Sequence, residues 1–216
     1  MHNTVKNLIY IEDLIKSKVN DDKVPKIIAV SKTFPIENIL PLIEYGHLHY
    51  GENKVQEALD KWTEIKNQNN SIKLHLIGKL QTNKVKFAFK IFDYIHSLDS
   101  EKLANKIADE QKKQNKRPKI FIQVNIGNED QKSGINKEKL FGFHKFCKSL
   151  NLDIIGTMCI PPNDQNTNSY FHEMSRINQE LNLKDLSIGM SGDYLYAVKN
   201  EATFVRIGSK IFGIRD

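Results

Sequence analysis

The stretch Lys-Ile-Ile-Ala-Val-Ser-Lys-Thr-Phe-Pro, residues 26–35, contains a short apolar run that ends in polar residues and then a proline. Such a run is typical of a buried strand in a parallel sheet, and the proline marks the start of a helix. The first strand of an open, nucleotide-binding sheet would lead into a glycine-rich phosphate loop. Residues 31–35 contain no glycine, so the stretch favours a closed barrel over the open sheet.

The same strand-then-helix pattern repeats along the chain. Expected strands are 26–31, 47–50, 73–77, 91–97, 119–125, 152–158, 185–188 and 203–207; expected helices are 36–45, 54–68, 82–89, 101–115, 137–150, 167–181 and 192–199. Alternating strands and helices imply a parallel sheet. In a chain of 216 residues this predicts an α/β fold, a single (β/α)₈ barrel of the TIM type. We expect one domain over residues 1–216, with residues 1–25 forming an additional N-terminal helix and lead-in.

Composition excludes several classes of protein. No apolar run approaches the ~18 residues of a membrane span, so we expect no membrane partner. The net charge is +6, and the densest basic run, Lys112–Lys119, suits either a solvated helix end or a nucleic-acid patch. It lacks interleaved aromatic residues, so we expect no nucleic-acid partner. Cys147 and Cys159 have no metal-ligand spacing, and no signal peptide is visible, which predicts a cytoplasmic protein without a metal.

Lys32 is the first candidate site residue. Functional groups of such barrels lie at the C-terminal ends of the strands. Side chains alternate along a strand, so Lys32 faces the barrel interior if Ile28 and Val30 do. A lysine at this place either extends to solvent or is a partly desolvated amine of the kind that forms Schiff bases.

Arg206 and two loops complete the candidate site. Arg206 ends the last strand, which lies beside the first once the barrel closes, and two inward cations indicate an anionic ligand between them. TIM-type barrels commonly bind phosphate with the loops after strands seven and eight, which here are 189–192 and 208–209, rich in glycine and serine. A structural ion pair for Arg206 and ordinary turn chemistry for the loops are the alternatives. A lysine, an arginine and a phosphate cup together indicate pyridoxal 5′-phosphate.

Several motifs resemble the YggS/PROSC family of pyridoxal phosphate homeostasis proteins, from about residue 26 to the end of the chain. They are Ala29–Thr33, His49–Asn53, His75–Lys84, Lys132–Gly134, Gly156–Pro161, Ser187–Ser191 and Val205–Gly213. That family is a single (β/α)₈ barrel related to the N-terminal domain of alanine racemase. The sequence departs from it at Lys79, where proline is common, and at Leu195, where an acidic residue is common, which puts in doubt a partner surface that uses those positions.

The resemblance also implies roles for individual residues. Lys32 would hold pyridoxal phosphate as a Schiff base, and Arg206 would face the pyridine nitrogen. Ser191 and the amides of Gly208 and Ser209 would hold the phosphate. The remaining pocket residues would be Asn53, His75 and Met190, although His75 taken alone is equally a packed barrel histidine.

The sequence leaves two functions open: a non-catalytic protein of intracellular pyridoxal phosphate homeostasis, and a racemase-like enzyme that uses this cofactor. Arg206 cannot give up its proton, so a pyridine nitrogen facing it stays unprotonated and the ring is a poor electron sink. Racemases compensate with two bases on opposite faces, and only Lys32 is evident here. We therefore expect a monomer that is not an enzyme and meets apo-enzymes dependent on pyridoxal phosphate only transiently.

Overall fold

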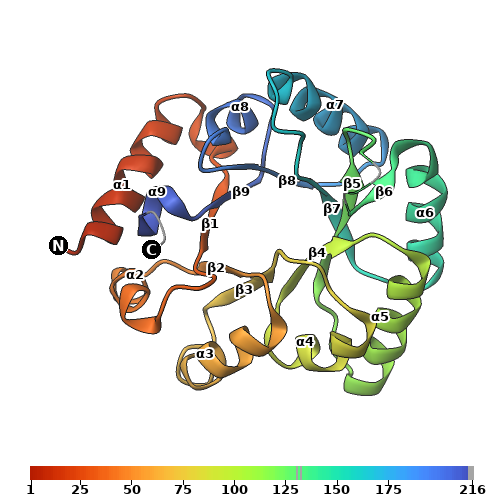
Figure 1. The fold of residues 1–216 in the computed structure, drawn as a ribbon, viewed down its shortest axis with the longest axis horizontal. Helices are drawn as coiled ribbons and strands as arrows, with labels where there is room; N and C mark the ends of the chain where they lie inside the picture. The colour runs from red at the N-terminus through yellow and green to blue at the C-terminus, as the bar shows by residue number, and fades with distance from the viewer. Residues whose placement is uncertain (130, 132, 214–216) are drawn as a thin grey trace.

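The computed structural model describes residues 1–129, 131 and 133–213. Its centre is a closed ring of parallel strands in the order β4-β3-β2-β1-β9-β8-β7-β5, which β4 and β5 close by pairing with each other (Figure 1). The strands of the ring are β1 (Lys26–Val30), β2 (His49–Glu52), β3 (Lys73–Leu76), β4 (Tyr94–Leu98), β5 (Lys119–Asn125), β7 (Ile154–Cys159), β8 (Asp185–Met190) and β9 (Phe204–Ile207). The predicted barrel is confirmed.

Helices surround the ring (Figure 1). They are α1 (Asn3–Lys16), α2 (Leu40–Tyr45), α3 (Val55–Gln68), α4 (Val85–Ile91), α5 (Glu101–Gln114), α6 (Lys137–Ser149), α7 (Thr167–Glu180), α8 (Tyr194–Lys199) and α9 (Ser209–Phe212). None of the helices in the described ranges is long and apolar enough to cross a bilayer.

Two kinds of element differ from the sequence prediction. The helix expected over residues 36–45 is divided into a 3₁₀ turn, Ile36–Asn38, and α2, because Pro41 lacks an amide hydrogen and fits only the first turn of a helix. Strand β6 (Ile135–Asn136) and α9 were not predicted. Both are too short to show a hydrophobic period.

The N-terminal helix α1 is confirmed. Its apolar residues Val5, Leu8, Ile11 and Ile15 are spaced three or four apart and are all buried. They pack toward α2 and α9 (Figure 1). Residues spaced in this way share one face of a helix, which explains why α1 buries that face against its neighbours.

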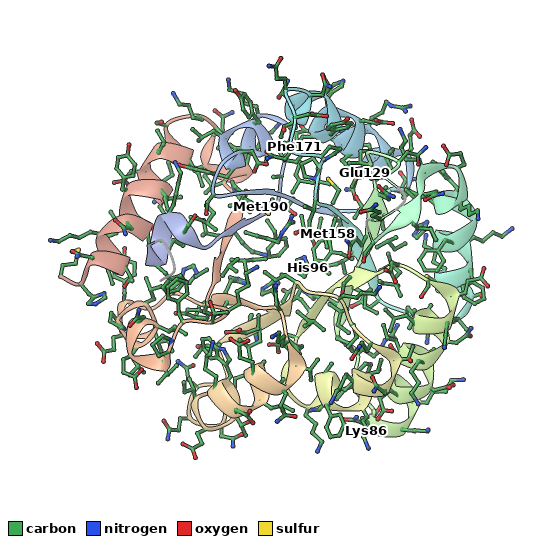
Figure 2. All side chains as sticks on the ribbon, viewed as in Figure 1. Lys86, His96, Glu129, Met158, Phe171 and Met190 are labelled. Atoms are coloured by element: carbon green, nitrogen blue, oxygen red, sulfur yellow. The ribbon has the colours of Figure 1, made fainter. Side chains whose placement is uncertain are left out.

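The inside of the barrel is lined by aromatic and apolar side chains. Ile28, Tyr94, Phe121, Met158 and Phe204 form a core separate from the larger one between strands and helices. Figure 2 shows Met158 inside the ring of strands. This core fills the barrel below its C-terminal end, so a ligand has room only at the rim.

Candidate functional site

A pocket of about 810 Å³ lies at the C-terminal end of the barrel, where β1, β2, β3, β8 and β9 end. All the binding residues expected from the sequence line it except His75: Lys32, Asn53, Met190, Ser191, Arg206, Gly208 and Ser209. A second hollow of about 790 Å³ lies near the opposite end, around residues 18–26 and 183–203, and contains none of them. The rim of the first pocket is therefore the candidate site.

The backbone on either side of Lys32 is held by side chains of β2 and α3. Before Lys32, the Ser31 hydroxyl donates to Glu52 Oε1 at 2.8 Å. After it, the Thr33 N–H donates to Glu57 Oε1 at 2.6 Å, and Thr33 has a left-handed backbone with φ of +66°. Residues other than glycine adopt that conformation only where the surroundings support it. These contacts fix the direction in which Lys32 leaves the strand.

Lys61 joins the two carboxylates of this arrangement. Its ammonium donates to Glu52 Oε1 at 3.0 Å, to Glu57 Oε1 at 3.2 Å and to the Ser31 carbonyl at 3.0 Å. Burial raises the pKa of the Glu57 carboxyl, but hydrogen bonds from Thr33 and Lys61 outweigh burial and lower it. Glu52 is fully buried and also accepts from the Trp62 indole at 2.9 Å. The charge of Lys61 thus compensates a carboxylate that has no access to water.

We expect Lys61→Met to lower the free energy of unfolding by about 3–5 kcal/mol, because it leaves the buried Glu52 charge without its cation. Urea denaturation of the variant against wild type measures this. Lys139→Met, on an exposed face of α6, is the control and should change stability by less than about 0.5 kcal/mol. Equal effects of the two substitutions would show that the Glu52–Lys61 pair does not hold the strand.

Arg206 lies at the floor of the pocket and is only 4% exposed. Its Nη1 donates to the carbonyl and hydroxyl of Ser187 at 2.7 and 2.8 Å, and its Nη2 donates to the Cys159 carbonyl at 2.8 Å. Burial lowers the pKa of the guanidinium, which nevertheless stays protonated at neutral pH. Within the described ranges Arg206 has no ion pair with a carboxylate, so it is a rigid cation under the pocket.

The loops after β8 and β9 meet at Ser191. The Ser191 hydroxyl accepts from the backbone N–H of Gly208 at 3.2 Å and of Lys210 at 3.5 Å. Gly189 starts the turn with φ of +87°, and a Cβ there would lie 2.4 Å from the Ala197 Cβ. Glycine is therefore required at this position for the turn to bring Ser191 to the pocket. Backbone N–H groups and a hydroxyl gathered in this way suit an anion.

His75 lies below the pocket and not in its wall. It shares the inner face of the barrel with the pocket residue Ile77, but stands two residues deeper and is fully buried. Its ring stacks on Tyr94, with 4.1 Å between the ring centroids. His75 is therefore a packed histidine of the barrel interior, which was one of the two interpretations that the sequence left open.

Several pocket residues were not among those expected from the sequence, and Gln123 and Lys79 are two of them. Gln123 on β5 lines the pocket and donates to the Ser133 carbonyl at 3.2 Å. The sequence could have indicated Gln123, because it lies two residues after the inward-facing Phe121 and so shares its face of the strand. Lys79, noted only as a departure from the family, also lines the pocket. Lys132 lies outside the described residues.

The buried histidines predict that the protein loses stability in acid. Burial lowers the pKa of His47 and His49 to about 4 and takes that of His75 and His96 well below the usual 6.5. A histidine with a depressed folded-state pKa gives stability that is present above about pH 6.5 and is lost as the pH falls toward the folded-state value.

We expect the free energy of unfolding to fall between pH 6.5 and 5, at up to about 1.4 kcal/mol per pH unit for each independent histidine. Urea denaturation at several pH values measures the slope. His75→Phe removes one of these groups and should make the slope shallower. A flat profile in the wild type would contradict the assignment of neutral buried histidines.

Comparison with known proteins identifies the family of the chain. Residues 13–216 match the family model described as the N-terminal domain of alanine racemase. The pyridoxal phosphate homeostasis protein of Pasteurella multocida is 35% identical, with 97% of each chain covered. That of Escherichia coli K12 is 32% identical, with 88% of this chain and 86% of the other covered.

Solved structures extend the comparison. PipY of Synechococcus elongatus, with PLP bound, superposes with a TM-score of 0.83 at 30% identity, covering 97% of this chain and all (100%) of that one. An alanine racemase of Clostridium difficile has a TM-score of 0.74 at 16% identity; this chain covers 57% of it, a likeness of fold alone. The chain therefore belongs to the pyridoxal phosphate homeostasis proteins, whose barrel is that of the alanine racemase N-terminal domain.

Proposed function

We propose that the protein binds pyridoxal 5′-phosphate in the rim pocket and serves intracellular homeostasis of this cofactor without substantial catalysis. The observation that carries the proposal is the convergence of Lys32, Arg206 and Ser191 on one pocket. Its relative PipY, 30% identical over nearly the whole chain, has PLP bound.

The residues of the pocket fit this cofactor. Three cations, Lys32, Lys79 and Arg206, line the pocket, and none of its described residues is a carboxylate. Its field therefore favours a dianionic phosphate. Apolar side chains, among them Ile77 and Met190, offer walls for an aromatic ring. The volume of about 810 Å³ is in the range of pockets that hold small molecules.

Each residue has a proposed task toward the cofactor. When bound, the cofactor supplies an aldehyde that condenses with the Lys32 amine to a Schiff base. Ser191 and the amides of Gly208 and Ser209 hold the phosphate, and Arg206 donates to the pyridine nitrogen. Asn53 and Met190 line the ring. Because the protein already fixes Arg206 through Ser187 and Cys159, binding costs little ordering of that side chain.

The racemase alternative needs a second base. No tyrosine, histidine or carboxylate is among the described residues lining the pocket. Lys79 is the other amine there, and its positive charge acts to lower the pKa of the Asp99 carboxyl. A charged ammonium has no lone pair to accept a proton, so Lys79 in this form is not a base. A single base on one face of a planar ring cannot deprotonate one face of an amino acid and reprotonate the other at enzymatic rates. The pocket therefore favours binding over catalysis.

We further propose a cytoplasmic monomer of one domain over residues 1–216 that transfers the cofactor in transient encounters with apo-enzymes. Ile160 and Met190 at the pocket mouth are 40% and 36% exposed. An exposed mouth supports exchange of the ligand with a partner. Equilibrium dialysis tests the proposal: we expect one pyridoxal phosphate retained per chain, and retention of far less than one per chain would contradict it.

We expect Ser191→Ala to weaken binding of pyridoxal phosphate about 10- to 150-fold, the equivalent of the 1.5–3 kcal/mol of a charge-assisted hydrogen bond. Fluorescence titration of Trp62 or absorbance titration measures the affinity. Ser149→Ala, an exposed serine on α6, should leave the affinity unchanged. Unchanged affinity in both variants would place the phosphate elsewhere.

A further inference from the structure

A line of hydrogen bonds crosses the inside of the barrel and ends on Arg206. His49 Nδ1 lies 2.9 Å from His75 Nε2, and His75 Nδ1 lies 2.9 Å from His96 Nε2. His96 Nδ1 then lies 3.0 Å from the hydroxyl of Ser187, which accepts from Arg206 Nη1 at 2.8 Å. We call His49, His75, His96 and Ser187 the histidine chain. Figure 2 shows His96 inside the ring of strands.

The direction of the histidine chain is set at Ser187. A serine hydroxyl has one hydrogen to donate and accepts through its lone pairs. Arg206 can only donate, so Ser187 accepts from it. The hydrogen of the fully buried Ser187 hydroxyl then needs an acceptor, and among the described residues that acceptor is His96 Nδ1. A reversed chain would point His96 N–H at Ser187 and leave the serine hydrogen without a partner, which is costly in a buried place.

The direction of the Ser187–His96 hydrogen bond determines the direction of every further hydrogen bond in the histidine chain. With Nδ1 accepting, neutral His96 carries its hydrogen on Nε2 and donates to His75 Nδ1. His75 in turn donates from Nε2 to His49 Nδ1. His49 keeps its own Nε2 hydrogen and is only half-buried, so that hydrogen can reach water. Every lone pair in the series thus faces the arginine cation and every hydrogen faces away from it, which is also the electrostatically favoured order.

Cations at the other end keep the series neutral. Lys26 and Lys73 are the first residues of β1 and β3. Lys26 and Lys73 both lower the pKa of His49, beyond the lowering by burial and by His47, while Asp93 acts in the opposite sense. Burial and Arg206 lower the pKa of His96. Protonation of the histidine chain is therefore unfavourable at both of its ends.

We propose that the histidine chain is a one-directional hydrogen-bond relay in which His96 and Ser187 position Arg206 beneath the pocket and His75 fixes the tautomer of His96. Its effect on a bound cofactor rests on the proposed function, whereas the relay itself does not. His96 and His75 are positioning residues, because the pocket lining includes neither.

Aromatic packing gives the relay its rigidity. His75 stacks on Tyr94 with 4.1 Å between centroids, and His96 stacks on Phe121 with 4.2 Å between centroids. Phe204 contacts both imidazole rings. Phenylalanine in place of a histidine would retain this stacking while it removes both ring nitrogens, so it separates hydrogen bonding from packing.

The first experiment is nitrogen NMR of the histidine side chains in the cofactor-free protein at neutral pH. We expect neutral rings with the hydrogen on Nε2 for His49, His75 and His96. An Nδ1–H tautomer or a charged ring at His75 or His96 overturns the relay. This outcome does not depend on any ligand.

The second experiment follows the hydrogens of the Arg206 guanidinium by their exchange with water. In His96→Leu we expect exchange about tenfold faster, the factor that corresponds to loss of one hydrogen bond. His96→Asn, whose side-chain oxygen can accept from Ser187 as Nδ1 does, should restore slow exchange. His144→Phe removes a buried imidazole outside the barrel and is the control. Equal exchange in His96→Leu and the control overturns the proposal.

The third experiment compares the absorption spectra of His75→Phe and His144→Phe after loading with pyridoxal phosphate. We expect a displaced absorption maximum in His75→Phe only, although His75 does not line the pocket. If both variants show the chromophore and their absorption spectra are identical, the proposed effect of the histidine chain on the cofactor is wrong. A chromophore absent from the wild type, with the NMR result as expected, rejects the proposed function and leaves the relay standing.

Discussion

Lys32→Ala is expected to abolish the visible absorbance of the protein loaded with pyridoxal phosphate and the adduct trapped by borohydride. Only an amine condenses with the cofactor's aldehyde, and alanine has none. Lys32 lines the pocket at the end of β1, beside the strand that carries Arg206. Non-covalent binding through the phosphate loops should persist at reduced affinity. Absorbance spectra and intact-mass measurement after borohydride check this result.

Lys79→Ala is the matched control, because Lys79 is a second amine in the same pocket. It should keep the chromophore and the trapped adduct. Loss of the adduct in Lys79→Ala together with its retention in Lys32→Ala would reverse the assignment of the two lysines.

The second prediction is that the protein loaded with pyridoxal phosphate does not racemise L-alanine at enzymatic rates, which are about 1–1,000 per second. Racemisation needs a proton taken on one face and returned on the other. Lys32 offers a base on one face, and the described pocket residues offer no tyrosine or histidine for the other. At most, slow exchange of the α-hydrogen is expected.

The measurement is incubation of L-alanine with loaded protein in deuterated water, with deuterium uptake and the D-isomer followed together. Uptake without the D-isomer would show one working base and agrees with the account. Formation of D-alanine at enzymatic rates would contradict the binding function, and Lys79→Ala would then show whether that lysine is the second base.

The barrel was predictable because its strands are short apolar runs with helices of regular period between them. Pattern also placed Lys32 and Arg206, since inward-facing residues alternate along β1 and β9 and both strands end at the same rim. The serine and glycine loops followed from their position after the last two strands. These parts of the site depend only on local sequence and on the general geometry of barrels.

Other features depended on contacts that no local pattern contains. The partners of Arg206 are Ser187 and a Cys159 carbonyl, far from it in sequence, so an ion pair remained open until the structure was known. The depth of His75 depends on how far β3 is shifted along the barrel relative to its neighbours, and that shift also aligns it with His49 and His96. The short elements β6 and α9 are stabilised by tertiary contacts and have no period of their own.

The central claim is that Lys32 carries pyridoxal phosphate in the rim pocket, and one measurement tests it most directly. The wild-type protein is incubated with pyridoxal phosphate, reduced with borohydride, digested and analysed by peptide mass spectrometry. The account predicts a yellow protein and a single phosphopyridoxyl-modified peptide whose fragments locate the modification at Lys32. A modification spread over surface lysines, or located at Lys79 or Lys132, would contradict it.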